Sequence, residues 1–174
     1  TVRAAQFSTR HGSVTAVQTF TVPERVNGEV RALTLSSPDG IDGAVRLTFE
    51  AVLAPWEDYV NHPAFARLGF QSVLRRNALL LRRLGRGEKP ETWLCAACDR
   101  QADFYAEGAL PGWLRAGYVQ VRVAVHTPPD TPWRVRFALG VGAHEDDAFA
   151  AAQRALVLPP ESAAVLPGAL AAQY

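Results

Sequence analysis

The side chains best suited to chemistry lie in one stretch near the middle of the chain. Asp58 and His62 are four residues apart, and three aromatic residues, Trp56, Tyr59 and Phe65, flank them. Aromatic faces stack on the apolar face of a pyranose ring, while a carboxylate and an imidazole bind its hydroxyl groups. These five residues therefore predict a carbohydrate-binding platform. The alternative is a loop packed on the protein by its own aromatic side chains, which is common in long surface loops.

Two histidines and two cysteines are further candidates for site chemistry. His126 and His144 flank the last expected strand and could approach each other, but no third ligand is evident, so no metal site is predicted. Cys95 and Cys98 form a CxxC inside an expected strand, where residues three apart point to opposite faces. This spacing favours two small, semi-buried thiols over a zinc site or a redox pair, which normally opens a helix.

A group of arginines follows the aromatic stretch. It either binds phosphate or an acidic partner, or forms a solvated sheet face, which is the simpler interpretation. Its members are Arg75, Arg76, Arg82, Arg83 and Arg86. The chain has no nucleophile-elbow, phosphate-loop, zinc-protease or dinucleotide-binding motif, and its carboxylates show no glycosidase-like pairing. The sequence therefore predicts no catalytic residue and no cofactor.

Length and composition predict one globular domain without a nucleic-acid or membrane partner. The chain has 174 residues, of which 48% are hydrophobic and 20% charged, enough to bury a core. Its net charge of +1 argues against a dedicated nucleic-acid binder. No run approaches the ~20 apolar residues of a membrane span, and no signal-peptide pattern is present, so we expect a cytoplasmic protein. The absence of methionine, even at position 1, favours a processed chain, a designed sequence or a fragment of a longer protein.

Alternation of apolar and polar residues predicts an all-β, mainly antiparallel fold. The expected strands are 3–8, 13–22, 30–36, 45–51, 70–74, 78–84, 92–98, 119–125 and 133–139, with 99–114 irregular and a helix over 66–84 as the rival to two of the strands. The last two strands predict a hairpin with a proline-rich connection. One short helix begins at 145–147 and ends before Pro159. We therefore expect a β-sandwich over residues 1–156 and a linker or tail over 157–174.

Three ordered stretches carry a family resemblance that covers residues 4–155. They are Phe7–Gly12 followed by Val30–Leu35; Glu50–Pro55 followed by His62–Phe65, Leu68 and Phe70; and Asp99-Arg100 with Phe104 and Gly108, followed by Phe137–Gly140 and the acidic, alanine-rich helix. They resemble the N-terminal, non-catalytic supersandwich domain of glycoside hydrolase family ninety-four, which contains cellobiose and chitobiose phosphorylases and cyclic β-1,2-glucan synthases. The chain departs from the family at Gln71–Leu74, where a glutamate-containing strand is expected, and it lacks the family's first strands.

The resemblance implies a module of an enzyme that acts on an oligosaccharide or glucan. It implies a following helical (α/α)6 catalytic domain, which holds the family's general-acid aspartate and is not in this chain. In the family, the sandwich supports dimerisation and shapes the substrate entrance, and only His62–Phe65 is carried over here as a site edge. The alternatives are a structural or homodimer-forming sandwich without its own ligand and, least favoured, a complete small enzyme.

Overall fold

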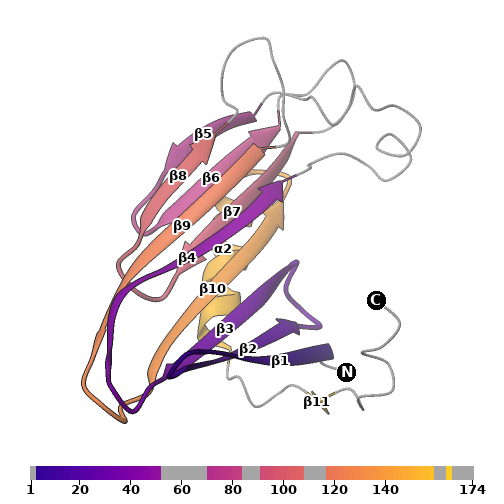
Figure 1. Ribbon diagram of the computed structural model, residues 1–174. Coiled ribbons are helices and arrows are strands. Elements are labelled where there is room, and N and C mark those ends of the chain that lie inside the picture. Colours follow the sequence, from indigo (N-terminus) through magenta and orange to yellow (C-terminus); the bar gives the residue numbers. More distant parts are fainter. Residues whose placement is uncertain (1–2, 52–69, 84–90, 108–116, 159–163, 166–174) are drawn as a thin grey trace.

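Two β-sheets and one helix form the part of the chain that the computed structural model describes, residues 3–51, 70–83, 91–107, 117–158 and 164–165 (Figure 1). The elements are β1 (Arg3–His11), β2 (Val14–Val22), β3 (Gly28–Ser36), β4 (Ile41–Ala51), β5 (Phe70–Leu74), β6 (Ala78–Arg83), β7 (Thr92–Cys98), β8 (Asp103–Glu107), β9 (Gly117–Thr127), β10 (Trp133–Gly142), α2 (Glu145–Val157) and β11 (Ala164–Val165). The predicted all-β fold with one short helix is confirmed.

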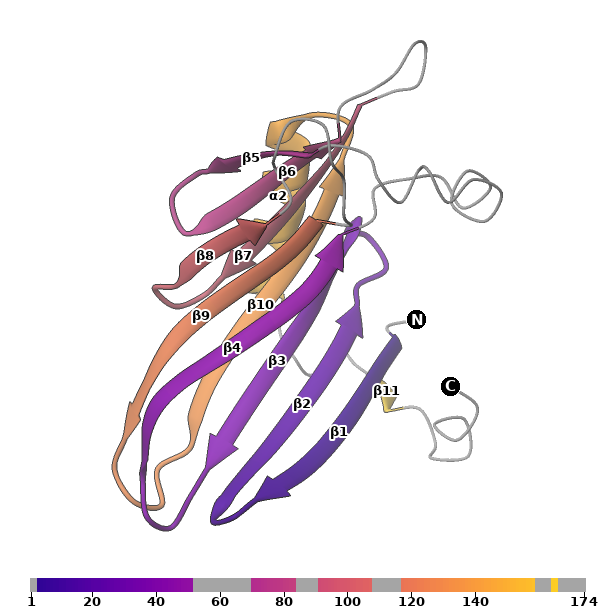
Figure 2. The same cartoon turned by 45° about the horizontal axis from the view of Figure 1, so that its top comes forward.

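The two sheets differ in size. The larger sheet has the strand order β11-β1-β2-β3-β10-β7-β6-β5, and the smaller sheet has the order β4-β9-β8. Neighbouring strands are antiparallel throughout, except that β11 runs parallel to β1. Figure 2 shows the smaller sheet lying across one face of the larger one, while α2 lies on the other face. The predicted antiparallel sandwich is therefore present.

The core between the sheets follows from the alternation along β9. Its four valines are fully buried, at Val119, Val121, Val123 and Val125, and the intervening Arg122 and Ala124 are exposed. They pack with side chains from the facing strands of the larger sheet, including Leu81, Leu94 and Phe137. Successive residues of a strand point to opposite faces, so one apolar face of β9 is enough to fix its orientation.

A second core lies between α2 and the outer face of the larger sheet. The helix contributes small buried side chains, including Ala148, Ala152 and Ala155, and the sheet contributes Leu80 and Trp93. Gly140 of β10 permits the close approach, because a Cβ there would lie 2.3 Å from the backbone nitrogen of Ala152 and 2.5 Å from the carbonyl oxygen of Ala148. The helix therefore rests against the backbone of β10.

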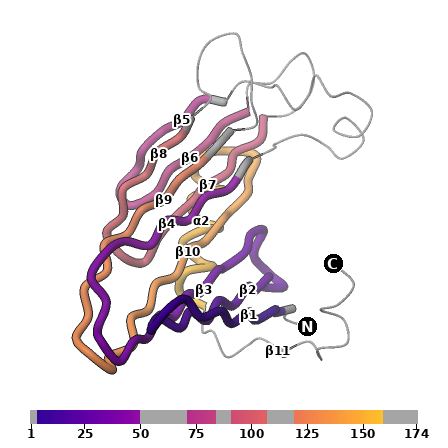
Figure 3. Tube along the Cα trace, in the orientation of Figure 1, coloured from indigo at the N-terminus to yellow at the C-terminus, as the bar shows by residue number. Residues whose placement is uncertain are grey.

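The predicted hairpin between the last two strands is wrong. β9 lies in the smaller sheet and pairs with β4 and β8, whereas β10 lies in the larger sheet and pairs with β3 and β7. The proline-rich connection instead crosses from one sheet to the other, beside the β3–β4 connection, where the backbone nitrogen of Asp130 donates to the Ser37 oxygen at 2.9 Å. Figure 3 traces both connections around the same end of the molecule. Alternation shows which face of a strand is buried but not which sheet contains it.

Two other segments test the strand predictions. Residues 70–83 form the β5–β6 pair rather than the rival helix. The apolar run Ala78–Leu81 that opens β6 is buried on both faces, as in an inner strand. The irregular segment predicted over 99–114 is wrong in part, since Asp103–Glu107 forms β8 at an edge of the smaller sheet. A five-residue edge strand with only Phe104 and Ala106 turned to the core gives a weak alternation signal.

Candidate functional site

The predicted carbohydrate platform lies outside the described residues. Its members, Trp56, Asp58, Tyr59, His62 and Phe65, all fall within 52–69. The structure therefore does not test this prediction, although it does show where the connecting stretch leaves the sandwich.

The strands on either side of that stretch meet at one end of the sandwich. Ala51, the last residue of β4, pairs with Gly117 at the start of β9, next to the Glu107–Tyr118 pair. At the same end of the larger sheet, Arg83 pairs with both Phe70 and Thr92 (Figure 1). The connections 52–69, 84–90 and 108–116 therefore all begin and end here. Loops gathered at one end of a rigid scaffold are where binding residues are usually found.

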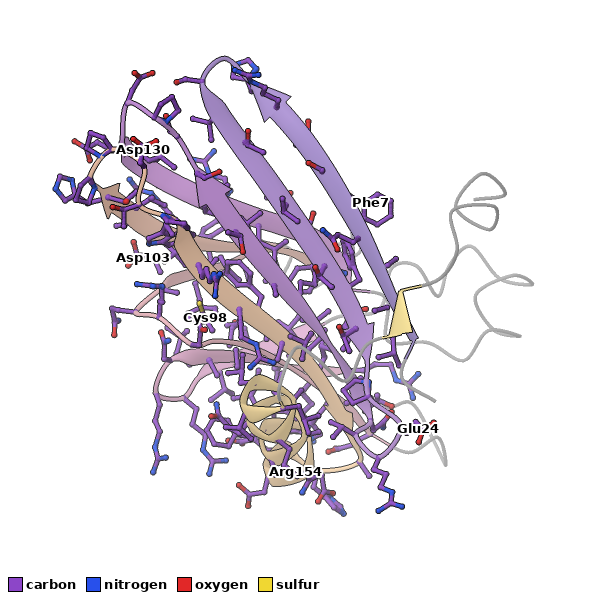
Figure 4. All side chains as sticks on the ribbon, turned by 90° about the horizontal axis from the view of Figure 1, so that it is seen from below. Phe7, Glu24, Cys98, Asp103, Asp130 and Arg154 are labelled. Atoms are coloured by element: carbon purple, nitrogen blue, oxygen red, sulfur yellow. The ribbon has the colours of Figure 1, made fainter. Side chains whose placement is uncertain are left out.

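A hollow of about 820 Å³ lies on the face of the larger sheet that also carries α2. Its floor follows the strand register, in which Gln6, Thr19, Ala32 and Arg136 lie side by side across β1, β2, β3 and β10. Its lining is Ala4, Ala5, Gln6, Thr19, Thr21, Pro23, Glu24, Arg25, Val26, Val30, Ala32, Leu33, Thr34, Asp99, Arg100, Arg134, Val135, Arg136 and Leu158. In Figure 4, Glu24 lies in the connection between β2 and β3. Thr19 and Thr21 are two residues apart in β2, so both side chains lie on the face of that strand that lines the hollow.

Arg136 connects the hollow to the end of α2. Its Nη2 donates to the carbonyl oxygens of Ala155 at 3.3 Å and Leu158 at 2.6 Å, so the guanidinium binds the negative end of the helix. Its Nε is buried and has no hydrogen-bond partner in the described part of the chain. Burial lowers the pKa of Arg136, and the nearby Asp99 carboxylate only partly opposes this. Asp99 in turn accepts the backbone N–H of Arg136 at 2.9 Å.

Arg100 approaches the same place from the end of β7. Its Nε donates to the carbonyl oxygen of Arg134, and its guanidinium lies 5.1 Å from the centre of the Trp133 ring. The sequence showed Arg134 and Arg136 only as polar positions of an alternating strand. α2 covers part of their face of β10 and makes Arg136 half-buried. The alternation along the strand could not predict this.

The structure does not bring the predicted arginine group together. Arg75 pairs with Glu145 and Asp146 in the first turn of α2, whereas Arg82 pairs with Glu91 at the far end of β6. Arg83 is buried, and Arg86 lies outside the described residues.

The histidines also lie apart. His126 lies near the start of the β9–β10 connection, with its Nδ1 3.7 Å from Asp42, and His144 lies beyond the other end of β10. Ten residues of extended strand, about 33 Å, separate these two ends. They therefore do not approach each other. Among the described residues, no group of three histidine, cysteine or acidic side chains could hold a metal ion.

The two cysteines point to opposite faces of β7, as predicted. Cys95 lies in the core under α2 and Cys98 in the core between the sheets, and neither forms a disulfide. Burial raises the pKa of the Cys95 thiol to about 12 and that of Cys98 to about 11. Both are therefore protonated at neutral pH, which leaves little of the thiolate that nucleophilic or redox chemistry requires.

Solved structures with a similar fold belong to carbohydrate-active enzymes. A protein from the human microbiome described as a kojibiose phosphorylase matches 92% of this chain and 22% of its own, with a TM-score of 0.63 and 8% identity. A heparinase III gene product matches 84% of this chain and 20% of its own, with a TM-score of 0.53 and 10% identity. The chain thus spans about a fifth of the length of each protein. At these identities the likeness shows the fold alone.

No protein-family model and no curated protein matches the sequence. Within the described ranges, no helix is both long and apolar enough to cross a membrane.

Proposed function

We propose that this chain is a non-catalytic β-sandwich module of a larger carbohydrate-active enzyme. The observation that carries the proposal is the likeness of fold over 92% of the chain to a part of a kojibiose phosphorylase. The sequence resemblance to glycoside hydrolase family ninety-four supports the narrower proposal of a glycoside phosphorylase or glucan synthase. The catalytic residues then belong to a following helical (α/α)6 domain, in a cytoplasmic enzyme.

The proposed role of the module is to bind an oligosaccharide or glucan at the substrate entrance. The end of the sandwich from which the connections 52–69, 84–90 and 108–116 leave is the proposed site. There, Trp56 and Tyr59 stack on sugar rings, and Asp58 and His62 bind sugar hydroxyls. The fold supplies the rigid strands, and the connections supply the side chains.

Binding of neutral sugars tests this role. Isothermal titration with kojibiose, cellobiose and a β-1,2-glucan should detect binding to at least one of the three. Tyr59→Ala should weaken that binding at least about tenfold, which corresponds to ~1.4 kcal/mol. Tyr105→Ala is the matched control, because Tyr105 is an exposed tyrosine of β8, 54% accessible, and belongs to none of the three connections that form the proposed site. No binding of any of the sugars, or equal losses in the two variants, would contradict the role.

A second candidate function is assembly, favoured by the unequal sheets. β4 is an edge strand of the three-stranded sheet, and it lies across a sheet of eight strands. Two apolar side chains of the larger sheet remain exposed, Phe7 of β1 at 57% and Val22 of β2 at 54%. Figure 4 shows the Phe7 ring projecting from β1. Among the described residues, no strand pairs with the outer edge of β4, and an unpaired edge of eleven residues is a ready template for a second strand.

The occupant proposed for this edge is a second copy of the chain. In a two-fold antiparallel pairing of β4 with its copy, centred on Ala44, Asp42 of each chain lies opposite Arg46 of the other. Both side chains are exposed and of opposite charge, so the pairing is complementary. Sedimentation equilibrium should detect a dimer that Asp42→Arg disrupts and Asp42→Arg with Arg46→Asp restores. A monomer at all concentrations would refute the homodimer.

A further inference from the structure

We propose that the hollow beside the end of α2 binds an acidic saccharide, through a sulfate or carboxylate group on the sugar. The choice of a saccharide as the ligand rests on the proposed function. The hollow would be a second site, on another face of the sandwich. The hollow has a volume of about 820 Å³, within the range of pockets that hold small ligands.

The charge of the lining favours an anion. Four arginines, Arg25, Arg100, Arg134 and Arg136, line the hollow together with two acidic residues. One of the acids, Asp99, already accepts the backbone N–H of Arg136. The guanidinium groups of Arg25 and Arg134 have no ion-pair partner among the described residues. The hollow is therefore a concentration of positive charge on a protein whose net charge is only +1.

Arg136 is an arginine of the hollow whose guanidinium is held in place by the protein. The carbonyl oxygens of Ala155 and Leu158 accept hydrogen bonds from its Nη2, while its Nε is buried and has no partner among the described residues. Arg134 lies two residues away on the same face of β10, and Arg100 contacts the carbonyl oxygen of Arg134. Guanidinium groups bind sulfate and carboxylate by paired N–H donors, and a held guanidinium loses less freedom on binding.

The floor favours a saccharide over a free inorganic anion. It carries Gln6 and the hydroxyls of Thr19, Thr21 and Thr34. Within the described part of the chain, these three hydroxyls have no side-chain hydrogen-bond partner. Sugar hydroxyls both donate and accept hydrogen bonds, as threonine hydroxyls do. A sugar ring over the floor with its acidic group toward Arg134 would satisfy both sets of groups.

Paired charged and neutral probes test the proposal. We would titrate the full chain with dextran sulfate oligosaccharides, oligogalacturonates and neutral dextran of equal length. Dextran sulfate and oligogalacturonate distinguish sulfate from carboxylate, and at least one of them should bind ten times or more tightly than dextran. Inorganic sulfate alone should bind more weakly than the sulfated sugar, because it cannot use the threonine floor.

Two arginine variants distinguish binding in the hollow from a general attraction of the acidic probe to a positive charge. Arg134→Ala should weaken binding of the acidic probe at least tenfold. Arg122→Ala is the matched control, since Arg122 is an exposed arginine of β9 and its loss changes the net charge equally. This variant should change affinity less than twofold. Thr19→Val removes one hydroxyl at nearly constant volume and should weaken binding two- to fivefold.

The inference is overturned if neither acidic probe binds more tightly than dextran, or if Arg122→Ala weakens binding as much as Arg134→Ala. Failure of the proposed function is distinguishable from both. It would appear as no effect of Tyr59→Ala on neutral sugars while Arg134→Ala still abolishes binding of the acidic probe. Loss of acidic-probe binding in Tyr59→Ala but not in Arg134→Ala would show that the acidic saccharide binds at the substrate-entrance site, and would refute binding in the hollow.

Discussion

Replacing Gly140 with alanine probes the contact between α2 and the larger sheet. The added Cβ would lie 2.3 Å from the backbone nitrogen of Ala152 and 2.5 Å from the carbonyl oxygen of Ala148. Both obstacles are helix backbone, which cannot rotate away as a flexible side chain can. The helix would have to move about 1 Å to restore an ordinary contact distance.

That movement has a cost that can be bounded. Overpacking a well-packed core costs about 1–3 kcal/mol, and a gap of ~0.5–1 Å forfeits a quarter to a half of the dispersion energy of the atoms around it. The buried alanines of α2 make such contacts along the whole helix. Alanine also lowers the backbone entropy of the unfolded chain, which stabilises the folded protein by only about 0.4–1 kcal/mol. We expect a net loss of about 2 kcal/mol, a fall in Tm of about 4–8 °C for a domain of this size.

Thermal unfolding followed by circular dichroism measures the change. Gly43→Ala is the matched control, because Gly43 lies in β4 and nothing stands within 4 Å of its added Cβ. Its Tm should be unchanged or slightly higher. A Gly140→Ala protein as stable as the wild type would refute the close helix–sheet contact.

Two further perturbations test other parts of the fold. Asn77 donates to the carbonyl oxygens of Cys98 and Arg100 and accepts the backbone N–H of Ala102, so Asn77→Ala should cost about 2–4 kcal/mol in urea unfolding. The free energy of unfolding of Asn77→Asp should lie between those of the wild type and Asn77→Ala, because aspartate keeps only the acceptor. A urea midpoint of Asn77→Ala equal to that of the wild type would contradict this role. Cys95 and Cys98 should resist a thiol reagent in the folded protein at neutral pH and react on unfolding, and fast reaction of the native protein would show that they are not buried. Their folded pKa values of about 12 and 11 exceed the ordinary 9.0, so their contribution to stability is complete below pH 9.0 and decreases above it as only the unfolded thiols ionise.

The sequence predicted the bounds of several strands and of the helix well. The expected strand 92–98 matches β7, and the expected helix start and end match α2. The opposite orientation of Cys95 and Cys98 also followed from the period of two in a strand. These features depend on neighbours in sequence, which alternation and end signals report directly.

One candidate site could be predicted from the sequence and the other could not. Residues of the right type for sugar binding, Trp56 to Phe65, could be named from composition and spacing alone, and their role stays a prediction. The hollow could not be predicted, because its floor combines Gln6, Thr19, Ala32 and Arg136 from four strands whose order is not sequential. Only the register of those strands brings these side chains together.

The sequence by itself determined that the chain is a β-rich protein, where most strands lie, and which face of each is apolar. Only the tertiary structure decided that β9 and β10 belong to different sheets, that α2 packs on the backbone of Gly140, and that Arg136 binds the end of that helix. The physical reason is that burial is a property of each residue, whereas pairing is a property of two distant segments. Alternating patterns as similar as those of β9 and β10 satisfy either sheet equally well until the whole chain is packed.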